Sequence, residues 1–211
     1  LGDGSNHDDG IYILLKEVVD NAVDEFIMGV GKRINISISP TGFVTVRDFG
    51  RGIPLGKVVD CVSTINTGAK YNTDVFQFSV GLNGVGTKAV NALSEVFIVT
   101  SYREGKFVSA TFNDGKLIDK SEGDTEEKNG TFIEFMPSTQ MFPGFIFDPA
   151  FVEKRLWRYA YLNAGLKAPS DDADQTARVR GSALWLAENL ERVPAMAIPC
   201  AETCNALSNS P

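Results

Sequence analysis

The chain has 211 residues, of which 43% are hydrophobic, so it can bury a sizeable core in one large domain or in one domain with an appendage. Its formal net charge of −7 argues against binding nucleic acid through a broad basic surface, because neutralised phosphates supply most of that affinity. The longest apolar runs are far shorter than the roughly 20 residues that cross a bilayer, and the chain does not open with a basic stretch followed by an apolar one. We therefore expect a soluble globular protein with no membrane partner.

Cysteine usage predicts a reducing compartment. Cys61, Cys200, Cys204 and the single His7 offer neither a disulfide framework nor the ligand spacing of a zinc site. We expect a cytoplasmic location.

The composition changes near residue 168, which predicts where the folded domain ends. All fourteen phenylalanines lie at or before Phe151, whereas residues 168–211 are rich in alanine. We expect one domain over residues 1–167 and a divergent, poorly ordered tail over residues 168–211. Because the chain begins at Leu1 rather than Met, we also expect it to be part of a longer protein, truncated at the N-terminus.

The predicted elements follow an α+β order. A helix over residues 11–28 ends at two glycines, and the alternating segments 33–39 and 43–46 are typical of a hairpin. The charged segment Ser121 to Asn129 is interpreted as a surface turn. This order predicts a largely antiparallel sheet with helices on one face. The remaining expected elements are a short helix at 55–64, a long polar loop at 66–83, a helix at 86–93, strands at 96–102, 107–113 and 131–136, and a helix at 149–163.

The first helix carries a polar stripe on a strongly apolar background. At about 100° per residue, Glu17, Asn21 and Asp24 fall within roughly 60° of one another. The apolar positions, which include Leu14 and Val18, point roughly 130° away. A carboxylate with an amide one turn later can activate a water and help to hold Mg²⁺, since hard cations prefer oxygen ligands. An ordinary solvated helix face has the same stripe, so this assignment depends on the other motifs.

A second motif places a carboxylate at the end of a predicted strand. Asp48 is followed by Gly50-Arg51-Gly52, whose glycines let the backbone approach a flat ring closely. The carboxylate is an acceptor for an exocyclic amine. The motif is suited to adenine, although Asp before Gly-x-Gly is also an ordinary surface turn.

A third motif, from Gly81 to Lys88, is rich in glycine and leads into a helix. Backbone amides at such a turn, together with a helix N-terminus, bind phosphate. After Gly86 the order is Thr-Lys, which is the reverse of a P-loop, and the segment has no dinucleotide G-x-G-x-x-G pattern. It predicts a triphosphate site of another type.

Together and in this order, the three motifs resemble those of the GHKL ATPase superfamily. Its nucleotide lies in a two-layer α/β sandwich, the Bergerat fold, with a mostly antiparallel mixed sheet and helices on one face. Glu17 to Glu25, Gly50 to Pro54, Thr67 to Tyr71 and Gly84 to Ser94 resemble the B-type ATPase subunits of bacterial type II topoisomerases, gyrase B and topoisomerase IV ParE. The resemblance spans about residues 1–167.

The resemblance implies a role for each matching residue. Glu17 would be the general base that deprotonates the attacking water, and Asn21 would supply an oxygen to Mg²⁺. Asp48 would accept from the adenine amine, with Thr131 sharing a bridging water. Further nucleotide contacts would come from Asp24, Glu25, Arg51, Gly52, Ile53 and Pro54 around the base, and from Lys70, Leu82, Asn83, Gly84, Val85 and Gly86 around the phosphates.

The resemblance also implies cofactors and partners. ATP and Mg²⁺ would drive DNA strand passage in a type II topoisomerase, whether supercoiling or decatenation. Its partners would be DNA, the A-type subunit, and a second copy of the B-type subunit, held through an N-terminal arm. That arm would precede residue 1, and the segment after residue 167 does not match the family's transducer domain, so we expect weak or no turnover from the fragment.

Two alternatives remain open at this point. One is a nucleotide-binding fragment without turnover of its own. The other is a MutL-type GHKL ATPase, against which the sequence Gly-Leu-Asn-Gly-Val-Gly from Gly81 to Gly86 argues. Gyrase and topoisomerase IV are not distinguished by these motifs.

Overall fold

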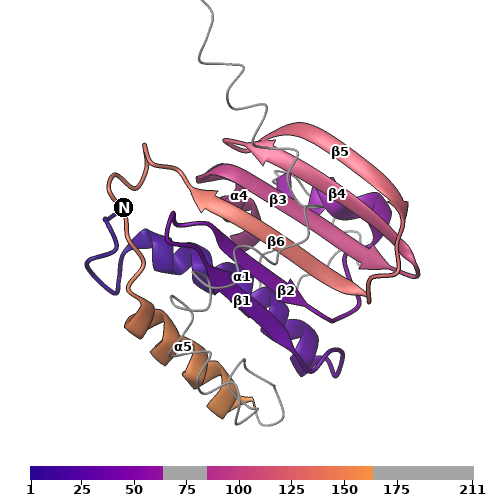
Figure 1. The fold of residues 1–211 in the computed structure, drawn as a ribbon, viewed down its shortest axis with the longest axis horizontal. Coiled ribbons are helices and arrows are strands. Elements are labelled where there is room, and N and C mark those ends of the chain that lie inside the picture. Colours follow the sequence, from indigo (N-terminus) through magenta and orange to yellow (C-terminus); the bar gives the residue numbers. More distant parts are fainter. Residues whose placement is uncertain (64–84, 164–211) are drawn as a thin grey trace, which may run out of the picture.

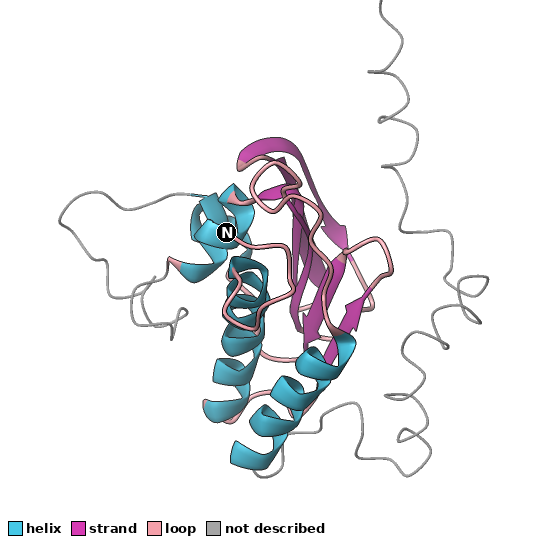
Figure 2. Cartoon of the chain, turned by 90° about the vertical axis from the view of Figure 1, so that its left-hand side faces the viewer, coloured by secondary structure: helices cyan, strands magenta, loops and turns pink. Residues whose placement is uncertain are grey.

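The structure is a computed structural model and describes residues 1–63 and 85–163. These ranges form two layers, a six-stranded sheet and helices that cover one of its faces (Figure 1, Figure 2). The strand order is β1-β2-β6-β3-β4-β5, and every described pair of neighbouring strands is antiparallel. The predicted α+β class is confirmed. In chain order the elements are α1 Gly10–Ile27, β1 Ile34–Ile38, β2 Val44–Asp48, η1 Leu55–Lys57, α2 Val58–Ser63, α4 Gly86–Ala92, β3 Ser94–Arg103, β4 Lys106–Asn113, β5 Lys116–Asp124, β6 Gly130–Pro137 and α5 Pro149–Leu162.

Helix α1 packs against the sheet through its apolar side. Ile11, Leu14, Val18 and Ala22 are all buried, as their spacing predicted. Burying each of the larger aliphatic side chains contributes roughly 1.5–3 kcal/mol relative to exposing it. The helix ends before Gly29, whose φ of 81° is a conformation that L side chains rarely adopt.

The predicted hairpin is confirmed by β1 and β2. Ile36 lies opposite Val46 in an antiparallel register. Since side chains alternate along a strand, Val44, Val46 and Asp48 share one face, and all three are buried. The carboxylate of Asp48 therefore lies under the helical layer rather than in solvent.

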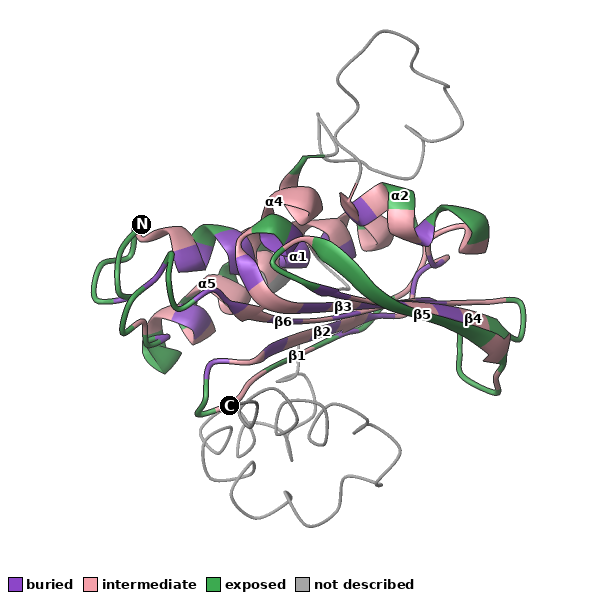
Figure 3. Cartoon of the chain, turned by 90° about the horizontal axis from the view of Figure 1, so that it is seen from above, coloured by how far each residue is buried: buried purple, intermediate pink, exposed green. Residues whose placement is uncertain are grey.

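The surface turn expected from Ser121 to Asn129 is wrong for its first four residues. These belong to β5, which pairs with β4 so that Ser121 lies opposite Ser109. Strand β5 is an edge strand that is exposed along nearly its whole length, so it lacks the apolar alternation that reveals a half-buried strand (Figure 3). Its signal in the sequence is the turn Asp114-Gly115, where both residues have positive φ, as a two-residue hairpin loop requires.

The last described helix, α5, confirms the helix expected at residues 149–163. It begins after Asp148, whose side chain accepts a hydrogen bond from the amide of Ala150 at 3.0 Å. It packs beside α1, where the hydroxyl of Tyr159 donates to the carboxylate of Asp20 (Figure 2). The expected loop at 66–83 and the expected tail at 168–211 lie outside the described residues. Among the described helices, none is long and apolar enough to cross a membrane.

Candidate active site

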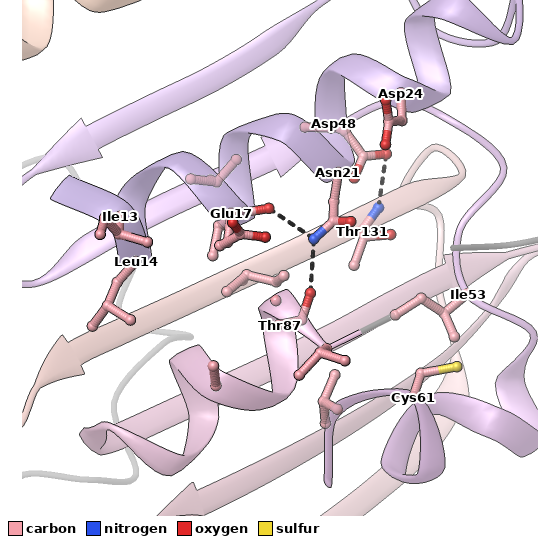
Figure 4. Close-up of a pocket in the computed structure, with 18 of the residues that line it drawn as sticks. Ile13, Leu14, Glu17, Asn21, Asp24, Asp48, Ile53, Cys61, Thr87 and Thr131 are labelled. Carbon is pink, nitrogen blue, oxygen red and sulfur yellow. Dashed lines mark hydrogen bonds between the residues drawn. The ribbon is translucent and has the colours of Figure 1, made fainter. Parts of the chain in front are cut away.

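A cavity of about 550 Å³ opens between the helices and the sheet (Figure 4). Its walls come from α1, the end of α2, the start of α4, and the sheet strands β2 and β6. All three sequence motifs contribute to it, since Glu17, Asp48 and Gly86 each line it. The chain therefore brings the helix stripe, the strand-end carboxylate and the glycine turn to one place.

Asp48 lies at one end of this cavity and is 7% exposed. Its Oδ1 accepts two backbone hydrogen bonds, from the amide of Gly50 at 2.8 Å and from the amide of Thr131 at 3.2 Å. No described residue donates a hydrogen bond to Oδ2. Burial raises the pKa of Asp48, while the two backbone donors and the positive charge of Arg47 oppose that increase. A buried carboxylate with one oxygen committed to the backbone is a selective acceptor for a single ligand donor.

Asn21 lies on the α1 wall and is oriented by two acceptors. Its Nδ2 donates to the backbone carbonyl of Glu17 at 2.8 Å and to the hydroxyl of Thr87 at 2.7 Å (Figure 4). Since an amide nitrogen has two protons, both are used, and the oxygen Oδ1 remains available for a cation or a water. The amide is thus held in the orientation that an oxygen ligand needs.

Glu17 lies one turn before Asn21 on the same wall, and its side chain is 36% exposed. It meets the start of α4 so closely that a Cβ at Gly86 would overlap its carboxylate. The ammonium of Lys16 lies 4.0 Å from Oε1 of Glu17 and 2.5 Å from Oδ2 of Asp20. A partly exposed carboxylate beside a glycine can face a water bound in the cavity.

The rim of the cavity is fixed by an ion pair between α1 and the Gly50-Arg51-Gly52 turn. Oε2 of Glu25 accepts from the backbone amide of Arg51 at 2.9 Å and from its Nε at 3.1 Å, while Oε1 accepts from Nη2 at 2.8 Å. A Cβ at Gly50 would lie 2.6 Å from Oε2, so only glycine fits there. The hydrogen bonds hold the turn against the helix.

Gly52 and Ile53 line the cavity because the same turn also contacts β3. Gly52 has a φ of 75°, and a Cβ there would lie 2.6 Å from the carbonyl oxygen of Tyr102. The hydroxyl of Ser101 donates to the carbonyl of Ile53 at 2.6 Å. These contacts hold the Ile53 side chain towards the cavity (Figure 4).

Asp24 completes the polar side of the α1 wall. Burial raises its pKa, and the negative charges of Asp20 and Glu25 add to the increase. Asp24 lines the same cavity as Asp48 and Thr131. The cavity is therefore lined by several carboxylates, which suits a ligand that donates hydrogen bonds.

The structure brings most of the predicted site residues together. Arg51 pairs with Glu25 at the rim, and Pro54 lies outside the lining. Four predicted phosphate contacts, Lys70, Leu82, Asn83 and Gly84, lie outside the described residues. The predicted residues that line the cavity are Glu17, Asn21, Asp24, Glu25, Asp48, Gly52, Ile53, Val85, Gly86 and Thr131.

The structure adds lining residues that sequence reasoning missed. Thr87 orients Asn21, and Val46, Ile133 and Cys61 form apolar surface near Asp48 and Ile53. Val46 could have been found from the alternation that places it on the same face as Asp48. No local pattern reveals Cys61 as a lining residue.

A protein-family model described as "Histidine kinase-, DNA gyrase B-, and HSP90-like ATPase" matches residues 6–140. Since the match covers more than half of the chain, the chain belongs to this ATPase family, whose members bind ATP. The superfamily expected from the motifs is thereby confirmed.

Individual relatives narrow the match to the ATPase domain of the B-type subunits of type II topoisomerases. The B subunit of DNA topoisomerase 4 from Borreliella burgdorferi is 56% identical over 166 residues, which are 79% of this chain and 28% of that protein. The B subunit of DNA gyrase from Thermus thermophilus is 38% identical over 175 residues, covering 78% of this chain and 28% of that protein. The crystal structure of the 43K ATPase domain of Thermus thermophilus gyrase B with an aminocoumarin matches with a TM-score of 0.65 and 33% identity, covering 78% of this chain and 42% of that one.

Proposed function

We propose that this chain binds ATP with Mg²⁺ in the cavity, as the ATPase domain of a type II topoisomerase, and that in the parent-length protein the γ-phosphate is hydrolysed there. The observation that carries the proposal is the convergence of three groups on one cavity: a buried carboxylate, an amide with a free oxygen, and a second carboxylate. Asp48, Asn21 and Glu17 supply these groups.

The adenine base would lie at the Asp48 end. Oδ2 of Asp48 would accept from the exocyclic amine, while Ile53, Val46 and Ile133 provide apolar surface for the ring. A charge-assisted hydrogen bond of this kind contributes about 1.5–3 kcal/mol in a buried site. Thr131 would contact the base through a water that it shares with Asp48. Its backbone amide already donates to Oδ1 of Asp48.

The phosphates would lie beside Asn21 and Glu17, where the cavity meets the start of α4. Within residues 1–63 and 85–163, no group of three or more His, Cys, Asp or Glu side chains could hold a metal ion. The Oδ1 atom of Asn21 would supply one oxygen ligand to Mg²⁺, because this hard cation takes oxygen ligands and completes its shell with phosphates and waters. When bound, the ion would neutralise charge on the phosphates.

Glu17 would act as the general base for hydrolysis. Its carboxylate would orient a water and accept its proton as the water oxygen attacks the γ-phosphorus and the bond to the β–γ bridging oxygen breaks. Gly86 leaves room for the Glu17 carboxylate, and the hydrogen bonds of Asn21 hold the neighbouring turn of α1 in place. The chemistry needs mainly positioning, which these contacts supply.

The proposed activity of the whole protein rests on its relatives. The chain spans only 28% of the length of the curated relatives described above. We propose that in the parent protein ATP drives strand passage in DNA, and that its partners are an A-type subunit together with a second copy of the B-type one. The names of the relatives support this assignment, since they are subunits of type II topoisomerases.

Phosphate release from Mg²⁺-ATP by the parent-length protein, measured beside nucleotide affinity, tests the proposed chemistry. Glu17→Ala should abolish phosphate release and leave affinity nearly intact, because it removes the base without touching the Asp48 end. Glu122→Ala is the matched control, since Glu122 is an exposed carboxylate on the edge strand β5. Binding without release by the wild type would favour a binding module, and loss of affinity in Glu17→Ala would contradict the assigned role.

A further inference from the structure

Arg47 is a charged residue that neither the motifs nor the proposed chemistry uses. It precedes Asp48 on β2 and, by the alternation of the strand, faces away from the cavity. Its guanidinium lies between two aromatic rings, with Cζ 4.6 Å from the ring centre of Phe49 and 4.6 Å from that of Tyr102. Such a cation between two π faces is held in one place.

The hydrogen bonds of Arg47 reach the two segments that shape the adenine end. Nη1 donates to the backbone carbonyl of Asp48, and Nη2 donates to the carbonyl of Lys128 at 2.5 Å. Lys128 lies just before β6, whose second residue, Thr131, donates its amide to Oδ1 of Asp48. Between them, Gly130 passes so close that a Cβ there would lie 2.9 Å from the carbonyl carbon of Asp48. One guanidinium therefore ties the end of β2 to the chain that supplies Thr131.

Arg47 also acts on the charge of Asp48. Burial raises the pKa of Asp48, the amides of Gly50 and Thr131 lower it, and Arg47 lowers it further, whereas Glu25 raises it. The other acidic residues that line the cavity, Glu17, Asp24 and Glu25, all lie on α1. Arg47 is thus the positive charge that favours the ionised form of a carboxyl facing acidic neighbours.

We propose that Arg47 is a positioning residue for adenine recognition, which fixes the backbone of Asp48 from outside the cavity. The inference rests on the proposed nucleotide function. Arg47 would thus contribute to the affinity for the base from the opposite face of the sheet, without touching the ligand.

The test is the dissociation constant of a non-hydrolysable ATP analogue with the full chain, measured from pH 5 to pH 8. Arg47→Met removes the charge and the hydrogen bonds but keeps an unbranched side chain between the rings. It should weaken binding about tenfold at pH 7.5, and the loss of affinity at acid pH should begin at higher pH than in the wild type. Arg47→Lys keeps the charge but loses the paired N–H donors of the guanidinium. It should therefore weaken binding less, and affinity should fall at the same acid pH as in the wild type.

Lys120→Met is the matched control, because it removes an equal charge at an exposed position on β5. Thermal unfolding of each variant establishes that it is folded. A merely structural role would lower affinity by the same factor at every pH, and that result, or unchanged affinity in Arg47→Met, would overturn the inference. If Arg47→Met does not fold, unchanged affinity in Arg47→Lys overturns it. A folded wild type that binds no analogue would instead contradict the proposed function itself.

Discussion

The side-chain amide of Asn21 donates to the hydroxyl of Thr87, with Nδ2 2.7 Å from Oγ1, and so connects α1 to α4 across the cavity. The second proton of the same nitrogen goes to the carbonyl of Glu17. The orientation of the amide is therefore set before any ligand arrives, with its oxygen left for a cation. Preorganisation of this kind favours binding because little ordering remains to be done.

Thr87→Val should weaken the contribution of Mg²⁺ to nucleotide binding. Valine keeps the shape of threonine but cannot accept from Asn21, which frees the amide to rotate. We expect the gain in affinity on adding Mg²⁺ to fall by about 0.5–1.5 kcal/mol, the value of one hydrogen bond. Calorimetry with and without Mg²⁺ measures this gain, and Thr87→Ser, which keeps the hydroxyl, should restore it. An unchanged gain in Thr87→Val would mean that Thr87 does not orient the ligand.

Asp48→Asn should change the pH dependence of stability. Because burial raises the pKa of Asp48 in the folded state, its stabilising contribution is full below the unfolded value of 3.8 and is lost as pH rises through the folded value. Asparagine keeps an oxygen for the amides of Gly50 and Thr131 but carries no charge. The free energy of unfolding of the variant should therefore rise relative to the wild type between pH 4 and pH 7. Urea unfolding at both pH values measures it, and a relative decrease would refute the burial argument.

In the parent-length protein, Gly86→Ala should reduce turnover far more than binding. The new Cβ would overlap the carboxylate of Glu17, which must then move away from its present position. A displaced general base typically loses about 10²-fold or more in rate. Gly56→Ala is the control, because a Cβ at Gly56 would meet no atom within 4 Å. Equal rates of phosphate release in Gly86→Ala and the wild type would rule out the proposed place of Glu17.

Tyr159→Phe should loosen α5 from α1. The variant loses the hydrogen bond to Asp20, so its free energy of unfolding at pH 7 should be lower by about 1 kcal/mol. Burial, and then the bond to Asp20, raise the pKa of Tyr159 above its usual value of 10.0, so the stability that it provides is lost as pH rises past about 10. Stability measured by urea unfolding should consequently fall less steeply above pH 10 in the variant. Identical curves for the two proteins would contradict the assigned bond.

The sequence predicts the fold best where one face of an element is buried. The stripe of Leu14 and Val18 on α1, and the alternation of Val44 and Val46 on β2, follow directly from burial. Strand β5 has no such face, since it lies at the edge of the sheet, and its charged composition resembles a turn. Only the Asp114-Gly115 loop marks it.

The site is predictable from sequence to the extent that its residues share one local element. Glu17 and Asn21 are one turn apart on a helix, so their alignment follows from helical geometry. Thr87 is 66 residues away from Asn21, and their contact depends on how α4 packs against α1. The contacts of Arg47 with Tyr102, and with a loop carbonyl 81 residues further along, leave no sign in the sequence because they depend on tertiary structure.

Titration calorimetry of the chain with a non-hydrolysable ATP analogue, with Mg²⁺ and with a chelator, tests the central claim most directly. The account predicts binding at one site that Mg²⁺ strengthens, and a loss of about 1.5–3 kcal/mol in Asp48→Asn, because that variant lacks the charged acceptor for the adenine amine. Circular dichroism of the same samples establishes that both proteins are folded. A folded wild type that binds no analogue, or equal affinity in Asp48→Asn, would contradict the assignment of this cavity as an adenine nucleotide site.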